Sequence, residues 1–147
     1  MGDAAHAIVP FYGQGMNASF EDVYVIDQIL SQQNGNWPAS LIEYQKVRKK
    51  DADAIADLAL DNFIEMQDKV ADPVFIKKRA LEMKLEQSYT DYYSKYSLVT
   101  FKEDLPYSEA MDLGRRQDAF LLKVCETKEV DEIDLDEVHR QLMSLSS

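Results

Sequence analysis

Three small residues near the N-terminus have the types and the spacing of a nucleotide-binding turn. Gly13, Gly15 and Ala18 fit the pattern G-x-G-x-x-A, in which glycines let the backbone approach a phosphate group closely. As a dinucleotide fingerprint the match is weak, because that fingerprint needs a preceding strand and Pro10 interrupts one. The alternative is an ordinary glycine-rich entry to a helix, which the spacing alone favours.

The physical chemistry of the turn does not depend on that fingerprint. We expect a helix to start near Met16 or Asn17, directly after the glycines. The first N–H groups of a helix have no partners within it and carry partial positive charge. Such a terminus attracts a phosphate or another delocalised anion. The expected chemistry is the binding of an electron-rich group by backbone amides.

Composition excludes several classes of protein. The chain has 147 residues, with 27 acidic residues against 16 lysines and arginines, and a formal charge of -11. This charge argues against binding to nucleic acids or to anionic membranes. The single cysteine, Cys125, excludes a disulfide or a cysteine-based metal site within the chain, and the two histidines are far apart. With no signal peptide or membrane-spanning run visible, we predict a cytoplasmic protein.

The rest of the chain is predicted to be mainly α-helical, with a loop over residues 1–16. Apolar residues spaced three or four apart and helix-capping residues define the expected helices. Their ranges are about 17–33, 38–50, 51–70, 73–87 and 106–124, followed by an amphipathic tail.

Several details of these helices are expected from local pattern. The first helix is expected to bury Phe20, Val23, Ile26, Ile29 and Leu30, and Gly114 is a weak point in the helix 106–124. Tyr89, Tyr92, Tyr93 and Tyr96 would share one helical face, whereas 98–101 looks extended. In the tail, Leu135, Val138, Leu142 and Leu145 form a narrow apolar seam that would suit pairing with another helix.

The glycine-rich segment also resembles a known family. Residues 2–6, Pro10, 13–17 and 20–22 (Gly-Asp-Ala-Ala-His, Pro, Gly-Gln-Gly-Met-Asn and Phe-Glu-Asp) resemble the second flavin-binding motif of the aromatic hydroxylase flavoproteins. Within that family, residues 7–18, 57–66 and 96–101 are similar to the enzymes that hydroxylate kynurenine. The resemblance covers about residues 1–125.

The resemblance implies the C-terminal portion of an α/β FAD-binding fold followed by a helical C-terminal region. Residues 1–35 would be the end of the FAD-binding domain, and residues 36–125 a helical region contributing to the substrate pocket. Residues 126–147 would form an acidic amphipathic tail.

Site residues follow from the same resemblance. It implies that Asp3 binds the ribityl or ribose side of FAD, and that Gly15, Met16 and Asn17 face the flavin pyrimidine edge. Phe11 and Met66 would line the pocket for the kynurenine ring, and Asn62 and Tyr96 would hold its amino-acid end. No side chain is expected to be catalytic, and no metal ligand is predicted.

The roles of three polar residues can be assessed from the sequence pattern alone, independently of the resemblance. Asn62 lies on an apolar stripe, and a buried amide without partners costs about 1–3 kcal/mol, so it caps a neighbouring segment or faces a ligand. His6 has no evident carboxylate partner, which favours a structural role over acid–base chemistry. Glu65 belongs to a polar network or is solvated, with nothing in the sequence to decide between them.

Family members are about three times as long as this chain and begin with a Gly-x-Gly-x-x-Gly unit that is absent here. In them NADPH reduces FAD, and one oxygen atom of dioxygen is placed on the ring of L-kynurenine. The resemblance therefore implies a fragment that lacks the N-terminal FAD-binding part, and we expect it to be inactive alone. The alternatives are a helical interaction module, one half of a split protein, or a related hydroxylase acting on phenols.

Overall fold

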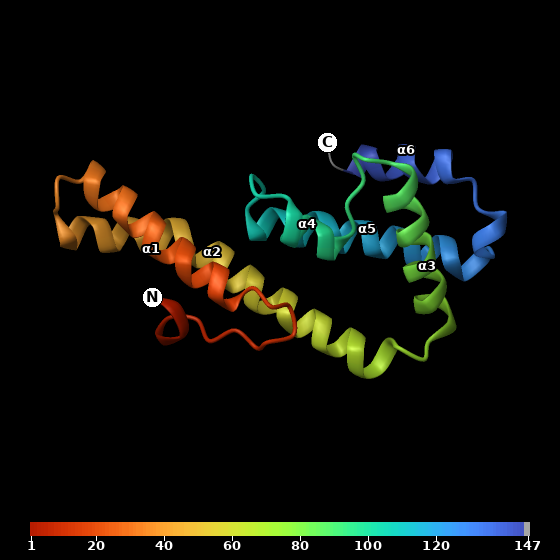
Figure 1. Ribbon diagram of the computed structural model, residues 1–147, viewed down its shortest axis with the longest axis horizontal. Helices are drawn as coiled ribbons and strands as arrows, with labels where there is room; N and C mark the ends of the chain where they lie inside the picture. The colour runs from red at the N-terminus through yellow and green to blue at the C-terminus, as the bar shows by residue number, and fades with distance from the viewer. Residues whose placement is uncertain (146–147) are drawn as a thin grey trace. The chain divides into compact units, whose positions relative to one another are not determined.

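The computed structural model describes residues 1–145, apart from the side chain of Asp68, and these residues form helices and turns without a strand (Figure 1). The prediction of a mainly α-helical chain is confirmed. The chain divides into two compact units, unit 1 (Met1–Phe63) and unit 2 (Ile64–Ser147). The elements are η1 (Gly2–Ala4), α1 (Gly15–Gln32), α2 (Trp37–Ile64), η2 (Glu65–Lys69), α3 (Pro73–Ser88), α4 (Lys95–Phe101), α5 (Tyr107–Thr127), η3 (Val130–Glu132) and α6 (Leu135–Leu145).

In unit 1, α1 and α2 form a helical hairpin, and the N-terminal segment returns along it (Figure 1). The predicted stop after α1 is confirmed. Asn34 and Gly35 adopt positive φ angles of 50° and 77°, and the Gly35 N–H donates to the Leu30 carbonyl at 2.9 Å. This is the left-handed termination that glycine and asparagine favour. The next helix then begins, with the Asn36 side chain accepting from the Ala39 N–H at 3.3 Å.

The predicted apolar face of α1 is partly wrong. Phe20 and Val23 are 67% and 54% exposed. The buried stripe instead follows the helical repeat of three or four residues. It consists of Ala18, Asp22, Ile26 and Ile29.

The predicted boundary between helices at residues 50 and 51 is also wrong, because α2 runs through it without interruption. No glycine or proline occurs between Pro38 and Pro73, so nothing in the backbone stops the helix there. After Ile64 the chain continues as the single π-helical turn η2. Such turns are rare and occur frequently at functional sites.

Unit 2 has an apolar core to which α3, α5 and α6 all contribute. Its N-terminal helix α3 starts as predicted, with the Asp72 carboxylate accepting from the Val74 N–H at 2.8 Å and Pro73 in the first turn. The buried members of the core are Leu81, Leu85, Tyr92, Leu121, Cys125, Ile133, Val138 and Leu142.

Two predictions for the middle of unit 2 are wrong. Residues 89–94 are not helical, so the four tyrosines do not share a helical face, and the segment expected to be extended is part of helix α4. The Ser94 side chain caps α4 by accepting from the Ser97 N–H at 3.4 Å. Leu98 and Val99 are buried in the helix that packs on α5. Packing therefore overrides the β propensity of the Leu-Val-Thr-Phe sequence.

Helix α5 is continuous around Gly114. A Cβ atom at this position would lie 2.6 Å from the Cγ atom of Lys95 and 2.8 Å from its Cβ atom. Glycine therefore permits the close approach of α4 to α5.

The apolar seam of the tail packs against other helices of unit 2, α5 among them, so it is not open to a helix of a partner protein. Val138 and Leu142 of α6 are buried in the core of unit 2. The division into compact units falls between Phe63 and Ile64, and the predicted functional segments 1–35, 36–125 and 126–147 stay a prediction. Among the described residues, no helix is both long and apolar enough to cross a membrane.

Candidate functional site

The tip of α1 has the open geometry that the glycine pattern predicts. Gly13 is exposed and has a φ of +73°, and no atom lies within 4 Å of the position a Cβ would take. The first intrahelical bond is donated by the Ala18 N–H to the Gln14 carbonyl at 2.9 Å. The Gln14 side chain does not cap the helix. Its Oε1 atom accepts instead from the side-chain amide of Asn17, Nδ2, at 2.7 Å. The preceding amides of this terminus, from Gly15 to Asn17, are placed to bind an electron-rich group.

A buried carboxylate, Asp22, connects this helix to the N-terminal segment. Its Oδ2 atom accepts from the Gly2 N–H at 2.9 Å and lies 2.6 Å from His6 Nε2. Its Oδ1 atom accepts from Arg48 Nε of α2 at 2.9 Å. Arg48 also donates through Nη2 to the Ala18 carbonyl at 3.0 Å. We call Gly2, His6, Asp22, Tyr44 and Arg48 the Asp22 cluster.

Electrostatics favour the ionised form of Asp22. Burial alone would raise the pKa of this carboxyl, but hydrogen bonds from Gly2, Arg48, His6 and Tyr44 outweigh that effect and lower the pKa to about 2. Burial and the hydrogen bond to Asp22 in turn raise the pKa of the Tyr44 hydroxyl to about 12. The cluster therefore holds a carboxylate and a neutral phenol at neutral pH.

The expectation that His6 has no carboxylate partner is wrong, because its partner lies sixteen residues along the chain. The sequence does carry a signal for this cluster. Asp22 interrupts the buried stripe of α1, and Arg48 precedes Ala52 and Ile55 at helical spacing on the buried stripe of α2. Two opposite charges on apolar helix faces indicate a buried ion pair.

Phe11 and Asn62 come together in unit 1. The Asn62 side-chain amide donates to the Phe11 carbonyl, and the Phe11 ring lies 4.6 Å from that of Phe63, centroid to centroid, tilted by 36°. The amide of Asn62 thus holds the loop that precedes Gly13. Of the two roles that the sequence left open for Asn62, this is the one in which it caps a neighbouring segment. The side-chain oxygen of Asn62 could still accept from a ligand, and that role stays a prediction.

The other predicted site residues are at the surface of their units. Asp3, Met16 and Asn17 are exposed in unit 1, and Gly15 is half-buried. Met66 on η2 and Tyr96 on α4 are exposed in unit 2.

Glu65, whose role the sequence left undecided, belongs to a polar network in unit 2. Lys95 Nζ lies 2.6 Å from a carboxylate oxygen of Glu65 and 2.6 Å from one of Asp118. Lys78 Nζ lies 2.5 Å from the other Asp118 oxygen and 2.9 Å from Glu82. We call these five residues the Lys95 network.

The pKa values within the Lys95 network shift in both directions. Burial lowers the pKa of Lys95, but Asp118 and Glu65 raise it by more. Burial likewise opposes the effect of Lys78 and Lys95 on Asp118, yet the two ammonium groups hold the pKa of that carboxyl below its usual range. Burial dominates for Glu82 and raises its pKa.

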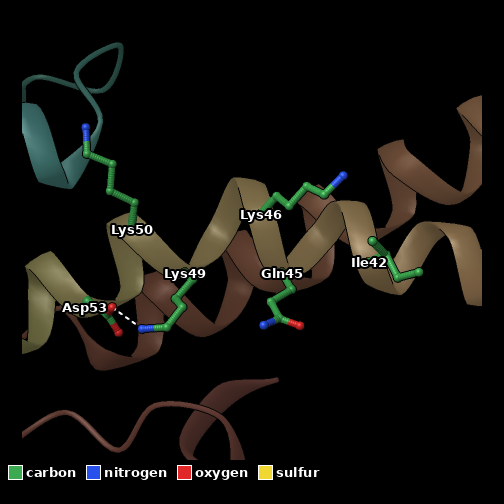
Figure 2. A pocket seen from close by; sticks show the side chains of 6 residues that line it. All are labelled: Ile42, Gln45, Lys46, Lys49, Lys50 and Asp53. Atoms are coloured by element: carbon green, nitrogen blue, oxygen red, sulfur yellow. Dashed lines mark hydrogen bonds and ion pairs between the residues drawn. The ribbon is translucent and has the colours of Figure 1, made fainter.

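Two hollows in unit 1 lie away from the predicted flavin residues. Figure 2 shows the side chains around the first, a groove of about 620 Å³ along α2, with Lys49 folded back onto Asp53. A second, of about 270 Å³, adjoins the Asp22 cluster and is lined partly by His6, Tyr44 and Arg48. Lys49 and Asp53 form an ion pair, so their two charges cancel and the pair adds no net charge to the first groove.

A known protein family is similar in sequence to the segment that contains this site. The sequence profile of the family described as "FAD binding domain" matches residues 1–59, which include the open helix tip and the whole Asp22 cluster. Residues 1–59 are therefore similar to the flavoproteins that share this domain.

More specific similarity extends through unit 2. A kynurenine 3-monooxygenase of Myxococcus xanthus is 43% identical over 137 residues, covering 92% of this chain and 29% of that protein. The enzyme of the same name from Cytophaga hutchinsonii is 48% identical over 116 residues, 78% of this chain and 26% of the relative. The one from Candida albicans is 39% identical over 125 residues, 84% and 27% respectively. The resemblance stated from motifs is thereby confirmed, and the chain spans less than a third of the length of these three relatives.

Proposed function

We propose that this chain forms the flavin-facing and substrate-facing C-terminal segment of an FAD- and NADPH-dependent kynurenine 3-monooxygenase. The reaction consumes L-kynurenine, dioxygen, NADPH and a proton, and gives 3-hydroxykynurenine, NADP⁺ and water. The observation that carries the proposal is the uncapped tip of α1 after Gly13, within the region matched by the FAD-binding family.

The residues present fit the cofactor. FAD, when bound, supplies the redox chemistry with dioxygen. The amides of Gly15, Met16 and Asn17 are suited to the flavin pyrimidine edge, where negative charge gathers on reduction, because a helix N-terminus stabilises anions. Asp3 is exposed in η1 and is suited to the hydroxyl groups of the ribityl or ribose chain.

Four residues are proposed to contact the substrate. Phe11, supported by Phe63 and by the Asn62 amide, offers an apolar ring surface in unit 1. Met66 and Tyr96 offer a thioether and a phenol from unit 2. We assign Phe11 and Met66 to the aromatic ring of kynurenine, and Asn62 and Tyr96 to its amino-acid end.

We expect the isolated chain neither to hydroxylate kynurenine nor to bind FAD tightly, since it corresponds to less than a third of the relatives above. The measurement is a titration of the purified chain with FAD, followed by flavin fluorescence. Purified protein that retains stoichiometric yellow FAD would contradict this expectation.

The sharper test is a hybrid enzyme. Residues of this chain replace the matching 137-residue segment of the Myxococcus xanthus relative. We expect the hybrid to retain FAD and to form 3-hydroxykynurenine with kynurenine-dependent NADPH oxidation. A hybrid that is folded by circular dichroism but carries no FAD, or that oxidises NADPH without response to kynurenine, would refute the proposal.

None of the alternative functions has a comparable observation behind it. A helical interaction module would use the tail seam, but Val138 and Leu142 are buried in unit 2. A hydroxylase acting on phenols shares the flavin motif, and the hybrid separates it by testing simple phenols beside kynurenine as substrates.

A further inference from the structure

The Asp22 cluster joins the two ends of the proposed cofactor site without containing any residue assigned to it. Asp22 is fully buried, and the Arg48 side chain is only 6% exposed. The donors to this one carboxylate come from two segments, since the N-terminal turn supplies Gly2 and His6, and α2 supplies Arg48. Asp22 itself lies on a third segment, α1. Hydrogen bonds and ion pairs to one shared carboxylate fix the positions of segments that are far apart in sequence.

The first end held by the cluster is the turn that presents Asp3. Gly2 donates its N–H to Asp22, and its carbonyl accepts from the N–H groups of Ala5 and His6 at 2.8 and 3.0 Å. His6 is tied to the same Asp22 oxygen. Asp3 therefore lies between two anchored residues. Gly2 also adopts a φ of +58°, which other residues rarely tolerate.

The second end is the tip of α1. Arg48 donates to the Ala18 carbonyl while it holds Asp22, so the guanidinium binds the first two turns of α1 at two points. Ala18 is the residue whose N–H makes the first bond of that helix. The direction of the open amides at Gly15 to Asn17 is consequently set by contacts from α2.

We propose that Asp22 is a positioning residue of the flavin site, acting with His6 and Arg48 to hold the Asp3 turn and the α1 tip in one fixed frame. This inference rests on the proposed function, because the frame is defined by the groups assigned to FAD. A buried ion pair is weak evidence for stability alone, since apolar residues of similar volume often replace one without loss. Its fixed bond directions are what an apolar contact does not supply.

The experiment compares Asp22→Asn with Glu21→Gln. Glu21 is the matched control because it is the neighbouring acid and pairs with the same arginine, Nη1 to Oε2 at 3.0 Å, but its side chain is 47% exposed. In the full 147-residue chain, amide hydrogen exchange is followed by NMR. We expect exchange at Ala5 and His6 to accelerate at least tenfold in Asp22→Asn and less than twofold in Glu21→Gln, with Leu81 and Leu85 unchanged in both.

The second readout is FAD affinity, measured in the hybrid enzyme. We expect Asp22→Asn to raise the Kd for FAD at least tenfold, and Glu21→Gln to leave it within twofold. Arg48→Met should weaken binding similarly, and Arg48→Lys should restore part of the affinity because it keeps the charge. This graded rescue is not expected if the arginine only fills space.

The outcomes separate this inference from the proposed function. An unvaried hybrid without FAD sinks the proposed function, and the exchange measurement still decides whether Asp22 anchors the turn. A hybrid that binds FAD equally well with and without Asp22→Asn overturns the inference. So does faster exchange spread evenly through residues 15–60, because Asp22 would then support only the general stability of unit 1.

Discussion

Unit 1 and unit 2 both bury charged groups, but they use them differently. In unit 1 a single carboxylate, Asp22, gathers its donors from an irregular segment and from α2. In unit 2 the Lys95 network alternates acids and bases between helices and the π turn η2. The first arrangement fixes a loop onto helices, whereas the second joins helical elements to one another.

The apolar groups of the two units are more alike. Leu81 and Leu85 are fully buried in unit 2, and Ile55 is fully buried in unit 1. Each unit also exposes large apolar side chains, such as Phe20 at 67% in unit 1 and Phe101 at 66% in unit 2. Since apolar burial is the main source of folding free energy in both, the units differ in how their charged groups are arranged.

The largest expected effect tests the core of unit 2. Leu85→Ala removes a fully buried side chain and should cost about 2–5 kcal/mol, because it leaves a cavity. Met83→Ala on the same helix is the control, since Met83 is 60% exposed and should cost less than about 0.5 kcal/mol. Hydrogen exchange measured by unit is the readout. Equal destabilisation of unit 1 by Leu85→Ala would break the comparison.

The next effect is the response of unit 1 to acid. The pKa of Asp22 is lowered from 3.8 to about 2, so its contribution is present above pH 3.8 and is lost as the pH falls through about 2. At about 1.4 kcal/mol per pH unit this amounts to about 2 kcal/mol. Asp22→Asn should lack this acid-dependent loss. The measurement is hydrogen exchange in α1 between pH 5 and pH 2.

Unit 2 should respond to acid less uniformly, because its carboxyls shift in opposite directions. The pKa values of Asp118 and Glu86 are lowered despite burial, whereas burial raises that of Glu82. As the pH falls, protonation of Glu82 therefore stabilises the folded state, whereas protonation of Asp118 destabilises it. The distinction between the units would fail if hydrogen exchange in α1 of unit 1 changed with pH in the same way in the Asp22→Asn chain and in the unvaried chain.

The smallest effect concerns Gly114, where two physical rules disagree on the sign. Helix propensity predicts that Gly114→Ala stabilises α5 by about 1 kcal/mol. Contact with Lys95 Cγ at 2.6 Å and Cα at 3.1 Å predicts the reverse, since overpacking costs about 1–3 kcal/mol. We expect a net loss of about 1 kcal/mol by thermal unfolding. Ala119→Gly, at an exposed position of the same helix, calibrates the propensity term, and a stabilised Gly114→Ala chain would show that α4 and α5 need no close contact.

Local signals in the sequence predicted several elements correctly. Asp72 and Pro73 predicted the start of α3, and Asn34 with Gly35 predicted the stop after α1. These signals are reliable because capping and positive φ angles depend on residues next to each other in the chain. The glycine turn and its helix were predicted in the same way, and the sequence motifs indicated the resemblance that the comparisons confirm.

Other features depended on contacts that a local pattern does not contain. The helix α4 formed where Leu98 to Phe101 suggested an extended segment, and the tail seam packed inside unit 2. Residues suited to two conformations adopt the one in which their side chains are buried. The roles assigned to the site residues remain proposals, and the structure adds the contacts of Asn62 and Phe11 to them.

By itself the sequence determined the helical character, the stop after α1, the start of α3 and the open amide tip behind Gly13, because each follows from backbone preferences of adjacent residues. Only the tertiary structure decided that Asp22 meets His6 and Arg48, and that Lys95 joins Glu65 to Asp118. A buried charge requires partners of opposite charge or hydrogen-bond donors. Which residues serve is set by how the helices pack. That packing joins Asp22 to Arg48 across 26 positions and Glu65 to Lys95 across 30.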